Sequence, residues 1–238
     1  MFTKSAAFYD TIYSFKNYER EAQQLHALIE QHKRSPGMTL LDVACGAGTH
    51  IPFLREHYAV EGLDLDADLL AIARERNPDI TFHQADMLDF ELGYSFDVIV
   101  CLFSSIGYVK TADKMKQAIQ NMSRHVQPGG LVIVEPWLTP DTYRPGMPHA
   151  LFVDRPELKI ARMNIGSVED GLSVLDFHYL IATSDGVDYF TERHELGLFT
   201  HADYLEAFRV SGLNVAHDPE GLMGRGLYIG IRPSVNGN

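Results

Sequence analysis

Two glycines directly after a short apolar run form the stretch best suited to binding a ligand. Residues 40–44 are typical of a buried strand, Gly46 and Gly48 follow, and a helical pattern begins at Thr49. Such a strand-to-helix turn lets a ligand lie against bare backbone, beside the unpaired amides at the start of the helix. A dinucleotide-binding fold has a third glycine, as in G-x-G-x-x-G, and Ile51 stands at that position. The turn predicts a ligand site, and the missing glycine weakens the case for a nicotinamide oxidoreductase.

Two aspartates at the ends of the next predicted strands extend this site. Asp64 ends the second strand, where a carboxylate can accept both hydroxyls of a ribose. The alternative is a helix cap, because Asp64 and Asp66 both precede a helical pattern. Asp86 follows the third strand, where it can accept an adenine amino group with Met87 against the ring, or lie in a surface turn. Together with the glycine turn, the two carboxylates favour a ligand that contains a nucleoside.

Other chemistries are not supported by the spacing of the reactive residues. His194 and Glu195 begin an H-E-x-x-H, but Leu198 occupies the second histidine position, so we expect no zinc pair. The sequence also contains no C-x-x-C and no G-x-S-x-G. We therefore expect no bound metal, and we interpret Ser104 and Ser105 as part of a loop rather than as a nucleophile.

Alternating strand and helix patterns in the first half of the chain position these residues. The predicted order is strand 40–44, helix 49–57, strand 59–64, helix 67–76, strand 80–84, strand 96–102, helix 114–125 and strand 131–135. Helical connections of this length between strands predict right-handed crossovers and a parallel sheet. Because such sheets bind ligands at the carboxyl ends of their strands, the glycine turn and both aspartates are expected at one edge.

The pattern changes after Trp137. A proline-rich connection at 139–148 leads into alternating runs over 151–200, where Asp-Gly dipeptides at 170–171 and 185–186 are hairpin signals. A further helix and two closing strands follow. We predict an α/β fold with three parts, which are an N-terminal helical arm or lid (1–37), a Rossmann-like ligand-binding domain (38–138 and 201–233) and a small antiparallel β insertion over the site (139–200).

Two segments outside the parallel sheet are expected to shape the site. The helical arm at 5–34 carries an aromatic stretch at 8–18, which we interpret either as a clasp on the core or as a lid over a ligand. In the insertion, a small sheet beside one core can bury only one of its faces. Because Tyr179, Phe190 and Phe199 leave the other face incompletely polar, we expect the insertion to pair two subunits in a homodimer.

Composition limits the class of partner. The 238 residues carry 20 basic and 32 acidic side chains, a formal charge of −12, which argues against nucleic acid as a partner. There is no apolar signal core at the start and no apolar run of about 20 residues, so we expect neither secretion nor membrane insertion. Cys45 and Cys101 stand in apolar contexts, as expected for reduced core residues of a cytoplasmic protein.

Several motifs together carry a family resemblance. The sequence D-V-A-C-G-x-G-T at 42–49 resembles motif I of the class I S-adenosylmethionine-dependent methyltransferases. F-Y-D-x-x-Y at 8–13, C-x-F-S-S-I-G at 101–107, V-E-P-W at 134–137 and G-R-G-L at 224–227 are narrower. They make the chain similar, nearly end to end, to the N,N-dimethyltransferases that act on nucleotide-linked 3-amino-deoxysugars. The resemblance implies a class I methyltransferase sheet, S-adenosylmethionine as cofactor, and methyl transfer to the amino group of such a sugar.

The same resemblance implies roles for individual residues. The cofactor would be bound by Tyr18, Ala44, Gly46, Gly48, Asp64, Leu65, Asp86, Met87 and Leu102. The small-molecule acceptor would be bound by Tyr13, Lys16, Trp137, His178 and Arg225, with Tyr13, Tyr108 and His178 as the catalytic candidates.

Two departures from the family concern the acceptor side. The sugar enzymes carry a histidine directly after S-S-I-G, where this chain has Tyr108, and their stretch between the tyrosines of the arm is longer and more basic than residues 14–17. Methylation of another small-molecule amine or hydroxyl, and a catalytically silent S-adenosylmethionine-binding protein, therefore stay open as alternatives.

Overall fold

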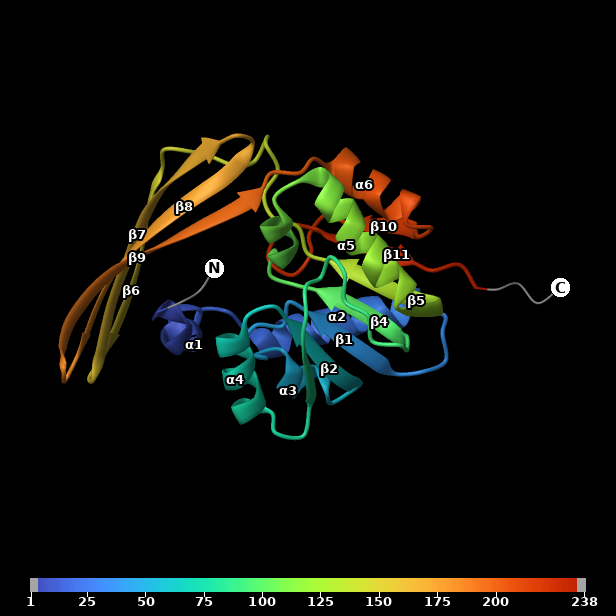
Figure 1. Ribbon diagram of the computed structural model, residues 1–238, viewed down its shortest axis with the longest axis horizontal. Coiled ribbons are helices and arrows are strands. Elements are labelled where there is room, and N and C mark those ends of the chain that lie inside the picture. The colour runs from blue at the N-terminus through green and yellow to red at the C-terminus, as the bar shows by residue number, and fades with distance from the viewer. Residues whose placement is uncertain (1–3, 235–238) are drawn as a thin grey trace.

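The computed structural model describes residues 4–234 and contains two separate β-sheets (Figure 1). The larger sheet has seven strands in the order β10-β11-β5-β4-β1-β2-β3. Strands β1 to β5 run parallel, whereas β11 is antiparallel to both β5 and β10. The bounds are β1 Thr39–Val43, β2 Ala59–Asp64, β3 Thr81–Gln84, β4 Phe96–Cys101, β5 Val126–Val134, β10 Asn214–Asp218 and β11 Leu227–Ile231. The predicted class I methyltransferase fold is confirmed, and all five strands of its parallel part lie where the sequence predicts them.

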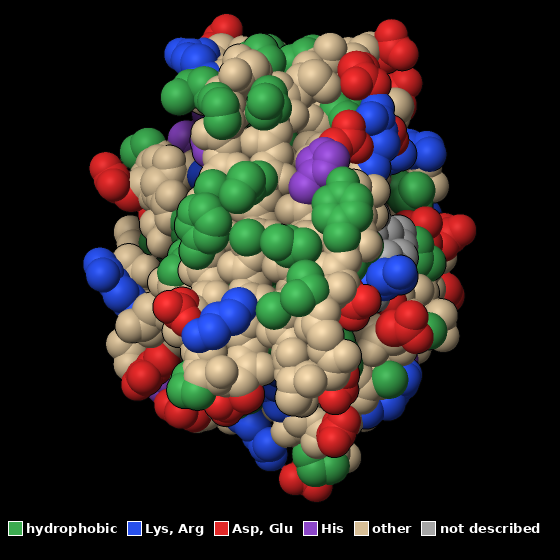
Figure 2. All heavy atoms as spheres, turned by 90° about the vertical axis from the view of Figure 1, so that its left-hand side faces the viewer, with side chains coloured by type: hydrophobic (Ala, Val, Ile, Leu, Met, Phe, Trp, Pro, Cys, Tyr) green, Lys and Arg blue, Asp and Glu red, His purple; other side chains and the backbone are tan. Residues whose placement is uncertain are grey.

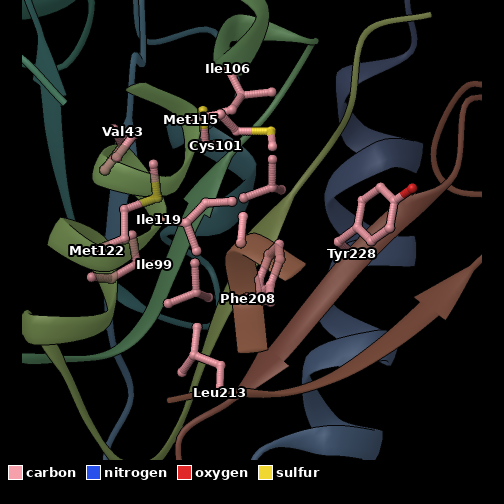
Figure 3. Close-up of a cluster of buried hydrophobic side chains, with 14 of the residues drawn as sticks. Val43, Ile99, Cys101, Ile106, Met115, Ile119, Met122, Phe208, Leu213 and Tyr228 are labelled. Atoms are coloured by element: carbon pink, nitrogen blue, oxygen red, sulfur yellow. The ribbon is translucent and has the colours of Figure 1, made fainter. Parts of the chain in front are cut away.

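Helices cover both faces of this sheet (Figure 1). Helices α5 (Ala112–Arg124) and α6 (His201–Val210) pack on one face, while α2 (Tyr18–His32) and α3 (Ile51–Leu54) pack on the other. Helix α5 buries Met115, Ala118, Ile119 and Met122, whose spacing of three and four residues places them on one face. Figure 3 shows Met115, Ile119 and Met122 in one cluster with side chains of β1, β4 and α6. The α5 and α6 face and the α2 and α3 face of the sheet therefore each carry a hydrophobic cluster.

The second sheet is an antiparallel meander of four strands at one end of the molecule (Figure 1). Its strands are β6 (Pro148–Arg155), β7 (Leu158–Glu169), β8 (Leu172–Thr183) and β9 (Gly186–Gly197). The Asp-Gly hairpins are confirmed, because β7 turns into β8 at Asp170–Gly171, where both residues have positive φ. Strand β6 is not among the strands that the sequence predicts, because the proline-rich segment before it hides the alternation.

The N-terminal arm is not one helix as predicted. A 3₁₀ helix (Lys4–Phe8) and the short α1 (Tyr9–Ile12) come first, and α2 begins only at Tyr18. Helix α2 begins after Asn17, because the Asn17 side chain accepts a hydrogen bond from the amide of Arg20 and caps the helix. The predicted helix at 49–57 is likewise reduced to the single turn of α3, directly after the glycines.

The arm packs between the two sheets. Ile12 and Tyr13 are buried against Ile160, Tyr179 and Ile181 on the inner face of the second sheet. Tyr9 packs on the same cluster, with its ring 4.7 Å from that of Tyr13, and also lines the cavities at the edge of the large sheet. The arm is therefore both a hydrophobic clasp and a wall of the site, which joins the two interpretations that the sequence left open.

Candidate active site

Two adjoining cavities lie at the carboxyl ends of the parallel strands. The larger has a volume of about 330 Å³ and the smaller about 40 Å³, and they share Tyr9, Ala44, Gly46 and Ser105 in their walls. The larger cavity is also lined by Leu63, Asp64, Leu65, Asp66, Leu69, Ala85, Asp86, Met87, Leu88, Tyr108, Val109, Lys110 and Lys114. The smaller is also lined by Tyr18, Asp42, Cys45, Thr49, His50, Leu102 and Phe103. Eight of the nine predicted cofactor residues are among these two sets.

The glycine turn leaves one side of the backbone bare. Ala44, Gly46 and Gly48 all have positive φ, and a side chain at Gly46 would meet no atom within 4 Å. A flat ligand can therefore lie directly against this peptide. Gly48 differs from the prediction, because it lines neither cavity and packs within 3.2 Å of Ala73 on α4 (Ala67–Arg76), measured from an added Cβ. Its role here is to let the turn approach the helix.

Asp64 supports the turn and keeps acceptor capacity. Its Oδ2 accepts the amide of Gly46 at 2.7 Å, and its Oδ1 accepts the amide of Asp66 at 2.9 Å. The helix cap is Asp66, which accepts the amides of Asp68 and Leu69. Because a carboxylate offers about four lone-pair positions, two remain on Asp64 for the hydroxyls of a ribose. Burial raises the pKa of Asp64, and the amide bonds oppose that shift.

The far end of the larger cavity suits a purine ring. Asp86 accepts the amide of Leu88 at 2.9 Å and keeps further lone pairs beside the cavity. Met87 and Leu88 supply apolar wall, and the half-exposed Leu65 forms an edge. This combination offers apolar faces for a ring and a carboxylate for its amino group.

The smaller cavity contains a buried carboxyl group that can pair with a bound cation. Asp42 is almost completely buried, and burial, together with the nearby Asp64 carboxylate, raises its pKa to about 8. Ionisation of such a group becomes favourable when a positive charge binds beside it. Tyr18 and His50 close the cavity with their rings 4.8 Å apart and edge to face. A ligand with both a nucleoside and an ammonium group fits the two cavities together.

Strained backbone after β4 shapes the side of the site towards the second sheet. Phe103 and Ser104 both have positive φ, a conformation that costs about 1–3 kcal/mol per non-glycine residue and concentrates at functional sites. The amide of Phe103 donates to Oε2 of the buried Glu135 at 2.7 Å, and the Ser104 hydroxyl donates to the Pro136 carbonyl at 2.7 Å. The C-terminal end of β4 is thereby fixed to the residues that follow β5.

Arg225 lies in this region as predicted from the G-R-G-L motif. Its Nη1 donates to the Ser104 hydroxyl at 2.8 Å, and its guanidinium carbon is 4.9 Å from the centre of the Trp137 ring. Trp137 in turn donates from Nε1 to the Ser173 hydroxyl at 2.8 Å. The two acceptor-side candidates are therefore in contact as a cation–π pair, and one donor of Arg225 is bonded to Ser104.

Lys16 and Tyr13 are buried beside this pair. Lys16 forms an ion pair with Glu21 at 3.0 Å and lies 3.8 Å from the centre of the Phe103 ring. Tyr13 packs edge to face on the same ring, and its hydroxyl accepts a hydrogen bond from Arg162 at 3.3 Å. Both side chains reach the acceptor region, but neither is among the lining residues of the two cavities.

His178 is the predicted candidate that the structure places elsewhere. Its side chain is exposed on the outer face of the second sheet, where Nδ1 is 2.7 Å from the hydroxyl of Tyr189. The neighbouring Tyr179 points inward and is completely buried against the arm. Within this chain His178 therefore does not face the site, and its role towards the acceptor is not supported.

Several charged or titratable residues at or beside the site were missed by the sequence analysis. They include Asp42, Glu21, His50, Glu135, Arg162 and His194. The V-E-P-W motif contains Glu135, and the H-E dipeptide drew attention to His194 but only as a metal ligand. His50 directly follows the D-V-A-C-G-x-G-T motif and belongs to its longer form, whereas nothing in the sequence pattern marks Glu21 or Arg162.

The described part of the chain contains neither a candidate metal site nor a candidate membrane-spanning helix. Within residues 4–234, no group of three or more His, Cys, Asp and Glu side chains could hold a metal ion. None of the helices in that range is long and apolar enough to cross a membrane.

Comparisons with known proteins agree with this geometry. A family model described as a methyltransferase domain matches residues 40–130. The dTDP-3-amino-3,6-dideoxy-alpha-D-glucopyranose N,N-dimethyltransferase of Streptomyces fradiae is 41% identical over 236 residues, which cover 98% of this chain and 92% of that protein. The dTDP-3-amino-3,4,6-trideoxy-alpha-D-glucopyranose N,N-dimethyltransferase of Streptomyces venezuelae is 40% identical and covers 91% and 92%.

Solved structures show the same similarity in three dimensions. The crystal structure of Streptomyces venezuelae DesVI matches with a TM-score of 0.91 at 37% identity, over 98% of this chain and 100% of that one. The structure of S-adenosylmethionine-bound CalS10, an amino pentose methyltransferase from Micromonospora echinaspora, matches with a TM-score of 0.87 at 31% identity, over 98% of each chain.

Proposed function

Because the chain belongs to the S-adenosylmethionine-dependent methyltransferases related to the dTDP-aminodeoxysugar N,N-dimethyltransferases, we propose that its acceptor is the amino group of a nucleotide-linked amino-deoxysugar. The observation that carries the proposal is the 41% identity over nearly the whole of both chains. That similarity includes the second sheet and the arm, which form the acceptor side of the site and not only the cofactor-binding core.

The cavity residues fit S-adenosylmethionine, the cofactor of this family. Asp64 would hold the ribose, and Asp86 with Met87 the adenine, at the larger cavity. Asp42, Tyr18 and Leu102 would surround the methionine part at the smaller cavity, where a buried carboxyl meets the ammonium. Gly46 offers the bare backbone between them. When bound, the cofactor supplies a methyl group on a positively charged sulfur.

The acceptor would enter between the arm and the second sheet. Arg225, held by Ser104 and stacked on Trp137, has a fork of donors that matches a phosphate of the nucleotide. Lys16 adds positive charge near Arg225, although its pair with Glu21 neutralises much of it. A small basic patch of this kind suits one nucleotide and is consistent with the acidic net charge of the chain.

The protein's contribution to the chemistry would be alignment in a water-poor site. The amine must be neutral and in line with the bond that breaks, at a distance of about 3 Å. Burial raises the pKa of Tyr9 and Tyr108 far above the ordinary value, so both hydroxyls keep their protons and neither is a general base. Desolvation of the bound ammonium lowers its own pKa and supplies the neutral amine. No covalent intermediate with the enzyme is needed.

We also propose that two copies associate through the outer face of the second sheet. Figure 2 shows hydrophobic side chains gathered on this face. They come from all four strands, and the exposed ones include Phe152, Met163, Ile165, Leu180, Val187 and Tyr189. An exposed apolar surface on a sheet of this kind is typical of a protein–protein contact.

The two cysteines are unpaired, as expected in a reducing cytoplasm.

The function is tested with labelled S-adenosylmethionine and two matched acceptors, a dTDP-linked 3-amino-deoxysugar and its 3-hydroxy analogue. We expect methyl transfer to the amine alone, with incorporation of two methyl groups at completion. Methylation of the hydroxyl compound would make the protein an O-methyltransferase. Cofactor binding without transfer to any amine would favour a catalytically silent binding protein.

A further inference from the structure

Two hydrogen-bonded contacts and one longer charge contact connect the N-terminal arm to the wall of the larger cavity. Ser5 donates its amide to Oε1 of Glu192 at 3.0 Å and its hydroxyl to Oε2 at 2.5 Å. Glu192 lies 3.8 Å from Nε2 of His194, and Nδ1 of His194 lies 2.6 Å from the hydroxyl of Tyr108. Ser5, Glu192 and His194 are buried, and Tyr108 lines the cavity. The series therefore ends at the place where the sugar enzymes carry a histidine.

The position of Glu192 determines which nitrogen of His194 carries the proton. A neutral imidazole has one N–H and one lone pair, and the group bonded to one nitrogen fixes the other. Nε2 lies 3.8 Å from Oε2 of Glu192, so the carboxylate charge favours the tautomer with the proton on Nε2, in which Nδ1 is an acceptor. The opposite tautomer would direct a lone pair at that carboxylate. With the proton on Nε2, Nδ1 of His194 accepts a hydrogen bond from the hydroxyl of Tyr108 across the 2.6 Å contact.

The groups around His194 keep it neutral. Among the residues that the structure describes, the charged or titratable groups beside it include Arg162 on β7, Glu192 on β9 and Tyr108, and the Phe177 ring on β8 packs edge to face at 5.3 Å. Burial lowers the pKa of His194 to about 4, with Glu192 opposing the shift and Arg162 adding to it. A neutral imidazole accepts the hydrogen bond of Tyr108 throughout the physiological pH range without taking the proton itself.

We infer that the Tyr108–His194 pair orients the acceptor amine and selects N–H donors over hydrogen-bond acceptors. A phenolic oxygen has one proton and two lone pairs, and here the proton is committed to His194. Its remaining lone pairs can accept only from a donor such as the amine N–H, which leaves the nitrogen lone pair directed at the methyl group. Tyr108 is then a catalytic residue and His194 a positioning residue.

The reaction balances without a protein base. The amine lone pair forms the new nitrogen–carbon bond while the carbon–sulfur bond breaks, and the positive charge passes from sulfur to nitrogen. The proton of the resulting ammonium leaves to water before a second transfer. The hydrogen bond from the amine N–H to the Tyr108 oxygen is available in both methyl transfers, because a primary amine and a singly methylated amine each retain at least one N–H.

The inference rests on the proposed function and is tested by a set of variants. His194→Leu removes the acceptor for the Tyr108 proton, His194→Asn replaces Nδ1 with an amide oxygen, and Tyr108→Phe removes the hydroxyl. We expect His194→Leu and Tyr108→Phe each to lower kcat/KM for the amine about 10- to 100-fold, and His194→Asn to recover most of the loss. The double variant should be no worse than Tyr108→Phe alone, because both changes remove one interaction.

A matched control exists elsewhere in the chain. His201 on α6 makes the same kind of contact, with Nδ1 2.8 Å from the hydroxyl of Tyr228, and it lines neither cavity. His201→Leu should leave kcat/KM unchanged. Additive losses in the double variant, or equal losses in His194→Leu and His194→Asn, would show that His194 has only a structural role.

A spectroscopic measurement separates this inference from the proposed function. Long-range proton–nitrogen correlation on histidine-labelled wild-type enzyme reports the tautomer of His194 without any turnover. We expect the neutral form with the proton on Nε2 from pH 6 to 9, and a shift of the Nδ1 resonance in Tyr108→Phe. A charged imidazole or a proton on Nδ1 overturns the inference, whether or not an amino sugar is methylated. Failure of the wild type to methylate any amine, with this tautomer present, overturns the proposed function instead.

Discussion

Replacement of Asp64 by alanine should weaken cofactor binding much more than it weakens the fold. The side chain makes two amide hydrogen bonds, to Gly46 at 2.7 Å and to Asp66 at 2.9 Å. Their loss is partly offset, because burial raises the pKa of this carboxyl and so disfavours its ionised form in the folded protein. That burial cost grows as pH rises above the unfolded pKa of about 4 and is complete above the folded pKa.

In Asp64→Ala the bound cofactor loses a charged hydrogen-bond acceptor, and no change in the burial of a carboxylate offsets this loss of binding free energy. Hydrogen bonds to a charged group contribute about 1.5–3 kcal/mol, so we expect the dissociation constant to rise about 10- to 150-fold. Titration calorimetry should give the same factor for S-adenosylmethionine and S-adenosylhomocysteine, since the carboxylate is proposed to hold the nucleoside and not the methyl group. The control is Asp203→Ala, which removes the capping box of α6 and should cost about 1 kcal/mol of stability with no change in affinity.

A ligand change distinguishes contact with the ribose from support of the turn. A 2′,3′-dideoxy analogue of S-adenosylhomocysteine should bind the wild type more weakly than the parent compound. It should bind Asp64→Ala as well as the parent does, because the partner of the missing hydroxyls is already gone. An unchanged affinity in Asp64→Ala, or an equal penalty for the analogue in both proteins, would refute the ribose assignment and leave Asp64 as a support of the glycine turn.

Three further predictions concern other parts of the molecule. Burial raises the pKa of Asp42 to about 8, so the free carboxyl is mostly protonated at pH 7, and an incoming ammonium should release that proton. Calorimetry in buffers of different ionisation enthalpy should show proton release at pH 7 and almost none at pH 9.5, and release at neither pH would contradict this. Arg225→Ala should raise the KM for the sugar nucleotide about tenfold or more while leaving the cofactor dissociation constant unchanged, and an unaffected KM would remove the phosphate contact. Leu180→Asp on the outer face of the second sheet should shift light scattering from dimer to monomer, whereas a monomeric wild type would contradict the homodimer.

The cofactor side of the site could be predicted from the sequence because its determinants are local. A buried run followed by glycines specifies a strand and a turn within a few residues, and parallel strands place their carboxyl ends together. Asp64 and Asp86 each end or follow such a strand, so their common edge follows from connectivity alone. The structure adds which residue does what: Asp66 and not Asp64 caps α4, and Gly48 packs on that helix and does not line the cavity.

The acceptor side depended on tertiary structure. The alternation of β8 separates His178 from Tyr179, but the period of two in a strand does not say which face is inward. The packing of the N-terminal arm determines which face of β8 is buried, because Ile12 and Tyr13 cover the face that contains Tyr179. The contact of Tyr108 with His194 likewise joins residues 86 positions apart, one in the 3₁₀ helix after β4 and the other on β9.

What the sequence by itself determined was therefore the parallel core, the glycine turn and the carboxylates at its edge, since local periodicity and chain connectivity are sufficient for these. Only the tertiary structure decided which face of the second sheet is buried, which charged side chains form ion pairs, and that His194 contacts the hydroxyl of Tyr108. These features arise where the arm and the second sheet pack together, and no short stretch of the sequence contains both sides of that contact.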